Sequence, residues 1–217
     1  MNLEILYEDD MLFVCRKPAG VATQTKRLGQ PDMESLLKNY RAAKGEQPYV
    51  GVVHRLDQPV EGIMVFAKTK EAASSLGRQI AKGIADKYYY AMTDGIPPEK
   101  KGTLEDYLLH NGKTNTSEVV TKGAPEAKKA VLSYEILEEN GKNAILKIRL
   151  QTGRHHQIRV QLAHAGCAIV GDKKYNFKEN IAPSGKMLAL CSYQIGFRHP
   201  VSHRKLEFKI DKPYYLS

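Results

Sequence analysis

The sequence has no tryptophan, only three cysteines and no long apolar run. A membrane-spanning helix needs roughly 18 or more consecutive apolar residues, and no stretch approaches that length. The cysteines stand singly at positions 15, 167 and 191, so we expect neither a disulfide framework nor a CxxC zinc knuckle. The opening MNLEILYEDD is acidic, whereas a secretory signal peptide begins with a basic region followed by an apolar one. These absences predict a cytoplasmic protein with reduced, structural thiols.

Motifs for the common cofactors and metals are absent as well. The GKT at 112–114 lacks the earlier glycine of a phosphate-binding loop, because Tyr107 stands there, and it is typical of a hairpin turn. His199 and His203 have the spacing of metal ligands on a helix, but Pro200 disfavours a helix at that place. No GxSxG or GxGxxG pattern occurs. We therefore expect no metal and no cofactor.

The positive charge is concentrated in the last third of the chain. Of 217 residues, 33 are Lys or Arg and 24 are Asp or Glu, which leaves a net charge of +9. Residues 141–217 hold 14 of the basic and 4 of the acidic residues, so the whole excess lies there. A concentrated basic surface attracts phosphate backbones, although a surface tuned for solubility is the alternative. Length and a hydrophobic content of 42% predict one domain over residues 1–217 with a substantial core.

Hydrophobic periodicity predicts many strands and a few helices that do not alternate with them. Helices are expected over 32–45, with Asp32 as N-cap, over 71–83, with Gly83 as C-cap, and over 153–166. Residues 111–129 are polar and are predicted to form a hairpin tip or a mobile arm. Strands are predicted twice within 3–20, and at 49–53, 62–68, 87–95, 102–112, 130–137, 143–151, 187–197 and 205–210. This order indicates a largely antiparallel α+β fold.

Three segments carry a specific pattern. They are VVHRLDQPVEGIMVFAKT at 52–69, DKYYYAMTDG at 86–95 and RLQTGRHHQIRVQLAHAGCAIVGDKKYN at 149–176. Together they closely resemble the RluA family of RNA pseudouridine synthases, which is marked by HRLD before a Gly-led apolar strand, by KxYxA, and by TGRxHQIR with a following GDxxYG-like turn. The flanking strands are similar too, so the resemblance covers nearly the whole chain.

The resemblance implies a fold and an activity. The fold would be α+β, a mostly antiparallel mixed sheet with a central catalytic cleft flanked by helices and loops. The activity would be isomerisation of specific uridines in structured RNA, ribosomal or transfer RNA, without a cofactor. The catalytic pattern begins at about residue 3, so we expect a stand-alone, monomeric catalytic domain without the S4 RNA-binding domain that often precedes it.

The resemblance also assigns site residues. Asp57 matches the catalytic aspartate, Tyr89 the active-site tyrosine, and Arg159 the arginine that pairs with the aspartate. Arg55 matches the arginine that enters the RNA helix in place of the flipped base. The other substrate-binding candidates in the three motifs are His54, Leu56, Lys87, Arg154, His156, Gln157 and Ile158.

Several of these assignments have alternatives. Arg154 is a second candidate for pairing with the aspartate, and the motif favours Arg159. Lys87 and Arg154 are equally consistent with ordinary phosphate contacts, and His156 with a role at the start of the helix that Ile158 anchors. A simpler interpretation of Asp57 is that it only caps the loop.

The chemistry of the reaction fits these residue types. Breaking the N1–C1′ bond of uridine calls for an ionised carboxylate at C1′ or C2′, and a nearby arginine opposes the rise in pKa that burial causes. A tyrosine ring stacks on uracil, and its hydroxyl is a candidate for moving the C5 proton. Strand alternation predicts that Tyr88 and Tyr90 share one face and Tyr89 the other.

Two other functions remain open. One is a catalytically silent RNA-binding protein or RNA chaperone of the same fold. The other is an RNA N-glycosidase, which needs a second carboxylate to activate water, and Glu61 is the nearby candidate. Glu61, Gln161 and Cys191 depart from residues common in the family, none of them at a catalytic match.

Overall fold

The structure of the protein is a computed structural model that describes residues 3–25, 29–178 and 185–216. Its contacts divide the chain into two compact units: unit 1 comprises residues 1–86 and 192–211, and unit 2 comprises residues 87–191 and 212–217. The α-helices are α1 (Met33–Ala43), α2 (Lys70–Ala81) and α3 (Gln157–His164), and the 3-10 helix η1 is Tyr214–Leu216. The strands are β1 (Glu4–Glu8), β2 (Leu12–Lys17), β3 (Gly51–Val52), β4 (Glu61–Ala67), β5 (Asp86–Asp94), β6 (Lys101–Asn111), β7 (Thr116–Val120), β8 (Lys128–Asn140), β9 (Asn143–Leu150), β10 (Ala168–Ile169), β11 (Leu190–Arg198) and β12 (Lys205–Lys209).

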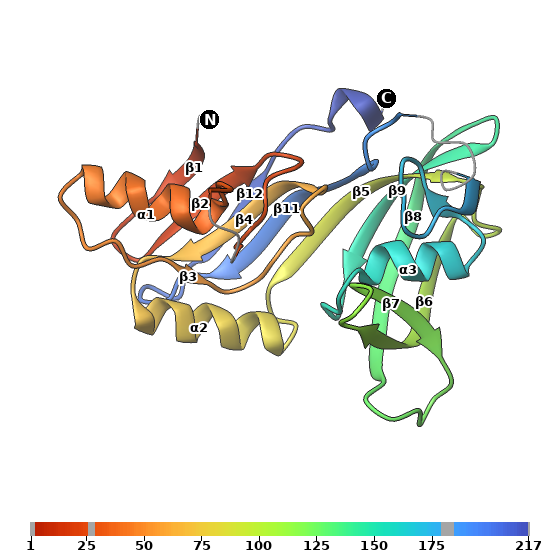
Figure 1. The fold of residues 1–217 in the computed structure, drawn as a ribbon, viewed down its shortest axis with the longest axis horizontal. Coiled ribbons are helices and arrows are strands. Elements are labelled where there is room, and N and C mark those ends of the chain that lie inside the picture. Colours follow the sequence, from red (N-terminus) through yellow and green to blue (C-terminus); the bar gives the residue numbers. More distant parts are fainter. Residues whose placement is uncertain (1–2, 26–28, 179–184, 217) are drawn as a thin grey trace. The chain divides into compact units, whose positions relative to one another are not determined.

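Unit 1 is a sheet with a helix on each side. Its strand order is β1-β2-β4-β11, with β3 added to β4 and β12 added to β11. Leu12 and Val14 on one face of β2 join the core cluster that includes Leu76 of α2. Phe13, which points the other way, meets the Tyr40 ring of α1 with ring centroids 6.0 Å apart. Figure 1 shows both helices beside these strands.

The two helices of unit 1 begin and end within two residues of the predicted bounds. The Asp32 carboxylate accepts a hydrogen bond from the Ser35 amide at 2.7 Å, which caps α1. Thr69 Oγ1 accepts from the Ala72 amide at 3.1 Å and caps α2. Lys82 is the C-cap of α2, and Gly83 follows it with φ 67°, a left-handed conformation that glycine adopts without strain. The prediction for Gly83 was therefore one residue off.

Unit 2 contains further antiparallel strands and one α-helix. Its strand order is β5-β9-β8-β6-β7, and β10 pairs with β5. Helix α3 packs on β6 and β8 through a small cluster of Leu108, Ala130 and Val160. The apolar residues of β9 that face the core, such as Leu146 and Ile148, are fully buried.

The α+β, mostly antiparallel fold class is confirmed, with two local corrections. The polar segment 111–129 contains strand β7, which forms a hairpin with β6, so the hairpin alternative was right. Helix α3 begins at Gln157, four residues later than predicted, and β10 was not predicted. No helix in the described part of the chain is long and apolar enough to cross a membrane. A single domain over residues 1–217 stays a prediction.

Candidate active site

The HRLD motif lies in unit 1, in the connection from β3 to β4. Leu56 is buried, with 6% of its surface exposed, whereas Asp57 is half-buried and Arg55 is exposed. The Val60 amide donates to the Asp57 carbonyl at 3.0 Å, which closes a tight turn after the carboxylate. The connection therefore buries the leucine and leaves the two charged side chains accessible.

Thr23, a buried residue far away in the sequence, holds the backbone next to Asp57. Its hydroxyl donates to the Leu56 carbonyl at 3.0 Å and accepts from the Leu56 amide at 3.2 Å. One hydroxyl thus satisfies both backbone polar groups of a buried residue, which otherwise would be costly to bury. The sequence contains no signal for this contact, because 33 residues separate the partners.

Lys17 holds the other side of Asp57. Its ammonium group donates to the carbonyls of Pro18, Val21 and Gln58, at 3.0, 2.6 and 3.1 Å. Burial lowers the pKa of Lys17 to about 8, although the negative charges of Asp57 and Glu61 act in the opposite direction. A buried cation therefore lies beside the candidate catalytic carboxylate.

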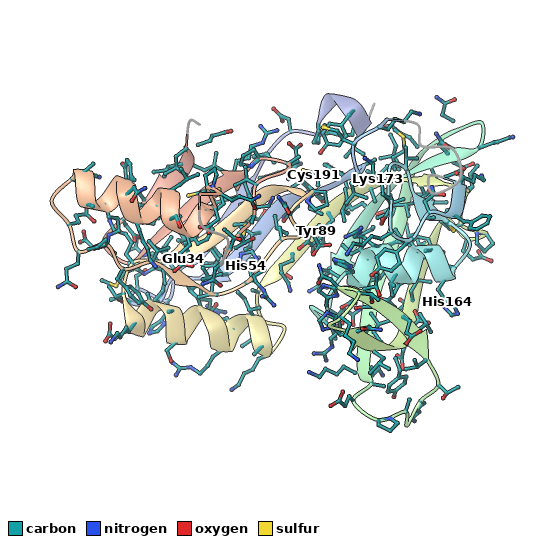
Figure 2. All side chains as sticks on the ribbon, viewed as in Figure 1. Glu34, His54, Tyr89, His164, Lys173 and Cys191 are labelled. Atoms are coloured by element: carbon teal, nitrogen blue, oxygen red, sulfur yellow. The ribbon has the colours of Figure 1, made fainter. Side chains whose placement is uncertain are left out.

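His54 extends the β3–β4 ladder with its side chain. The Val65 amide of β4 donates to His54 Nε2 at 3.1 Å, directly after the last backbone pair of the ladder, Val52 with Phe66. Because Nε2 accepts, the proton of a neutral His54 ring is on Nδ1. This histidine, a candidate for substrate binding, also ties the motif to the core strand; Figure 2 labels it.

Glu61, the candidate second carboxylate, begins strand β4. Its Oε1 lies 3.6 Å from Nη2 of Arg16 on the neighbouring strand β2. In the pairing of these strands Arg16 is opposite Ile63, the residue two positions after Glu61, so the two charged side chains share one face of the sheet. Glu61 is thus engaged in an ion pair of unit 1.

In unit 2, Tyr89 lies on β5 and faces the core (Figure 2). Burial alternates along this strand, so that Lys87 and Tyr89 are buried and Tyr88 and Tyr90 are half-buried. The Lys147 ammonium lies 5.4 Å from the Tyr88 ring centre, on the other face. The predicted alternation is confirmed.

Lys87 lies beside the TGR turn, on the Tyr89 face of β5. A Cβ added at Gly153 would lie 3.2 Å from Lys87 Nζ, so the ammonium lies close to this turn. Burial lowers the pKa of Lys87. With 7% of its surface exposed, Lys87 is unlike an ordinary surface contact to phosphate.

Gln157 ties the same turn to α3. Its Oε1 accepts from Thr152 Oγ1 at 2.8 Å and from the Arg154 amide at 3.0 Å. Its Nε2 donates to Gln161 at 2.9 Å, and both glutamines are buried. Arg154 is exposed and donates from Nε to the Lys129 carbonyl at 2.8 Å. Both the oxygen and the nitrogen of the Gln157 side-chain amide thus have hydrogen-bond partners within unit 2.

His156 is the N-cap residue of α3, with φ 52°, but its side chain does not cap the helix. Its Nδ1 instead lies 2.7 Å from the Tyr175 hydroxyl. The same hydroxyl accepts a hydrogen bond from the Ser117 amide at 2.8 Å. The prediction of a role at the helix start is right for the backbone and wrong for side-chain capping. Ile158, 4% exposed, anchors the helix as predicted.

Arg159 forms a buried two-pronged ion pair with Asp172. The guanidinium donates from Nε and Nη2 to the two carboxylate oxygens, both at 2.8 Å. Asp172 Oδ1 also accepts from the amide of Lys174, at 2.9 Å, and the Arg159 guanidinium lies over the Tyr175 ring. The turn after α3 therefore orients Arg159. The GDKKY stretch was part of the recognised pattern, but no role was assigned to Asp172 from the sequence.

The predicted residues thus form two sets. The HRLD residues are together in unit 1, and the residues of β5 and α3 are together in unit 2. Sequence reasoning missed the supports Thr23, Lys17, Asp172 and Tyr175. Within residues 3–25, 29–178 and 185–216, no group of three His, Cys, Asp or Glu side chains is arranged to hold a metal ion.

Known proteins are similar to this chain over nearly all of its length. An RNA pseudouridine synthase of Aquifex aeolicus is 30% identical over 97% of the chain, and one of Synechocystis is 35% identical over 92%. The ribosomal large subunit pseudouridine synthase D of Neisseria meningitidis is 31% identical over 98%. The chain spans 70%, 62% and 59% of the lengths of these three proteins.

The fold is also known. The human RNA pseudouridylate synthase domain containing 4 matches with a TM-score of 0.81 over 98% of this chain and 90% of that one, at 22% identity, which establishes the fold alone. The profile of the family described as RNA pseudouridylate synthase matches residues 11–164. Since that match covers more than half of the residues and includes the HRLD, KxYxA and HQIR motifs, the chain belongs to the RNA pseudouridylate synthase family.

Proposed function

We propose that the chain isomerises uridine in RNA to pseudouridine, with Asp57 as the catalytic carboxylate. The observation that carries this proposal is the support of the Asp57 connection. Buried Thr23 and Lys17 hold the backbone on both sides of Asp57, while its carboxylate is only half-buried. A reactive group needs such pre-organisation, because a carboxylate that is free to move loses much of its advantage over water.

The reaction requires one bond to break and one to form. The N1–C1′ bond breaks, the uracil turns, and the C5–C1′ bond forms, while C5 loses a proton and N1 gains one. Asp57 acts either by attack at C1′ or as a base at C2′. Either role needs the ionised carboxylate, and the Lys17 ammonium is the buried cation beside it.

The other site residues take the roles that the family pattern implies. Tyr89 stacks on the uracil, and its hydroxyl takes part in moving the C5 proton. Arg159, oriented by Asp172, matches the arginine that the family pattern assigns to the catalytic aspartate. Arg55, exposed beside Asp57, fills the space that the flipped base leaves, which offsets part of the few kcal/mol that flipping costs.

The substrate class is structured RNA in the cytoplasm, bound by a monomer. The relatives from Neisseria meningitidis and Vibrio cholerae are named for the large ribosomal subunit, which favours ribosomal RNA. Transfer RNA is the second candidate. The ion pair of Glu61 with Arg16 gives no support to an N-glycosidase, since that carboxylate has a cationic partner already.

The test is the release of tritium from C5 of labelled uridine in RNA by the purified protein. Asp57→Asn keeps the shape and removes the charge, so we expect the rate to fall by at least about 10²-fold. Asp10→Asn, which alters an exposed aspartate in the β1–β2 turn, is the control and should react as wild type. Undiminished release by Asp57→Asn contradicts the proposal.

The RNA target is found by mapping pseudouridine in total RNA from cells that lack the gene. We expect one or a few sites to vanish and to return with wild type but not with Asp57→Asn. If no site changes although the protein binds RNA, the silent RNA-binding function replaces the proposal. Free uracil in the purified reaction would instead identify a glycosidase.

A further inference from the structure

Four aromatic rings are in contact with one another in unit 2, at the start of helix α3. The His110 ring of β6 lies 4.1 Å from the His155 ring, which stacks on His156 at 3.7 Å and 26°. The Tyr175 ring meets His156 edge-on, with centroids 5.5 Å apart. We call these four residues the histidine stack. Its inner end is buried at His156, and its outer end, His110, is exposed.

Hydrogen bonds hold the stack in place. His155 Nδ1 lies 2.9 Å from the Ser117 hydroxyl, and Nε2 lies 3.1 Å from Asn115 Oδ1. Ser117 is directly opposite His110 in the pairing of β7 with β6, so the hairpin carries the outer ring and fixes the next one. A base that stacks on His110 would therefore meet a surface that loses little freedom on binding.

Basic side chains lie around the outer end. Lys128 is opposite Leu108 in the β6–β8 pairing, so it shares the face of His110, two residues further along β6. Arg154 precedes His155, and Lys174 donates to the Asn115 carbonyl at 2.6 Å. All three cations are exposed, and we call them the stack cations.

The nearby carboxylates do not neutralise this surface. Glu118 is opposite Leu109, and thus points to the other face of the hairpin. Asp172 is buried in its pair with Arg159, and Asp106 is engaged with Gln161. An accessible ring flanked by lysines and arginine is the combination that binds an unpaired nucleotide, through its base and its phosphates.

We propose that the histidine stack is an RNA contact, at which an unpaired base stacks on His110 while the stack cations pair with the adjoining phosphates. The inference rests on the proposed function, which makes RNA the substrate. It adds a point of recognition at two residues that the motifs do not assign: His110 lies between two motifs, and His155 is the variable position of TGRxHQIR.

The test measures RNA affinity by fluorescence anisotropy with the full-length protein. The probe is a fluorescein-labelled RNA hairpin with a loop of unpaired uridines. We expect His110→Ala to raise the Kd by about 5- to 100-fold, as loss of a base-stacking ring does. His110→Phe, which restores a ring without a charge, should stay within about 3-fold of wild type. His203→Asn, at an exposed histidine with φ 58° in unit 1, is the matched control and should leave the Kd unchanged.

The outcomes separate this inference from the proposed function. An unchanged Kd for His110→Ala overturns the inference, as does an equal loss for the alanine and phenylalanine variants, because a ring would then not restore binding. Failure of wild type to bind the hairpin also overturns it. A further outcome is that wild type and the variants show the expected Kd values while wild type releases no tritium from any RNA. In that case the stack stands as an RNA contact and the proposed isomerase activity fails.

Discussion

Single buried polar residues decide the geometry around Asp57. Thr23 forms hydrogen bonds with both the amide and the carbonyl of Leu56. Lys17 donates to three carbonyls, one of them that of Gln58, the residue after the aspartate. Each buried polar group that loses its partner costs about 1–3 kcal/mol, so these contacts make any other path of the connection unfavourable. The position of the carboxylate is thus determined by residues that do not react.

Lys17 should make the stability of the protein depend on pH in a definite direction. Its pKa is about 8 in the folded protein and 10.5 in an unfolded chain, so between these values the unfolded state binds more protons. The contribution of Lys17 to the free energy of unfolding then rises with pH, by about 2 kcal/mol from pH 7 to pH 10. Below pH 8 the full cost of burying the charge is present.

Urea unfolding of wild type and Lys17→Met at several pH values measures this effect. The free energy of unfolding of wild type should rise relative to that of Lys17→Met as pH rises. Groups that titrate in both proteins contribute equally to the two values, so they cancel in the difference. Two curves that stay parallel between pH 7 and pH 10 would show that Lys17 keeps its ordinary pKa.

At the scale of elements, the backbones of strands β4 and β11 lie close together at Gly62. A Cβ added at this glycine would lie 2.2 Å from the Ser192 carbonyl oxygen, and its φ is +132°. The Gly-led strand of the family pattern therefore has a packing reason: the backbone of β11 occupies the space of a side chain. The same glycine is one residue from Glu61, where the Asp57 connection enters the strand.

Two glycine substitutions test this account. Gly62→Ala should lower the free energy of unfolding by more than about 3 kcal/mol, since neither backbone is able to yield as a flexible side chain does. Gly77→Ala, within helix α2 and with open space around it, should raise the free energy by about 0.5–1 kcal/mol. The urea midpoints of the two variants measure these changes in stability. A Gly62→Ala protein as stable as wild type would refute the close approach of the two backbones.

At the scale of the whole molecule, the three cysteines lie inside the protein. Cys15 and Cys191 are fully buried, and Cys167 is 3% exposed. Burial raises the pKa of Cys15 to about 12 and also raises that of Cys167. A thiol that is both covered and protonated is a poor nucleophile. The structural role of the cysteines stays a prediction.

Reaction with a thiol reagent such as DTNB should therefore follow unfolding. We expect no rapid reaction of the native protein and three reactive thiols per chain in guanidinium chloride. Ser202→Cys, which places a thiol at an exposed turn position, should add one rapid native reaction and serves as the control. Rapid modification of native wild type would mean that the interior opens more readily than its packing indicates.

The sequence alone determined the elements and the family. Helices α1 and α2, the β5 alternation and the HRLD connection are specified by neighbouring residues, through period, caps and turn chemistry. Three short motifs, present in the order typical of the family, indicated the family.

The tertiary structure decided which distant residues support the site. Thr23 meets Leu56 across 33 positions, Arg159 meets Asp172 across 13, and His155 meets Ser117 across 38. A sequence pattern describes the environment of each residue along the chain, whereas a buried hydroxyl or cation is satisfied by whichever backbone or side chain the fold brings to it. The burial of Lys17 and the histidine stack therefore became visible only in the folded protein.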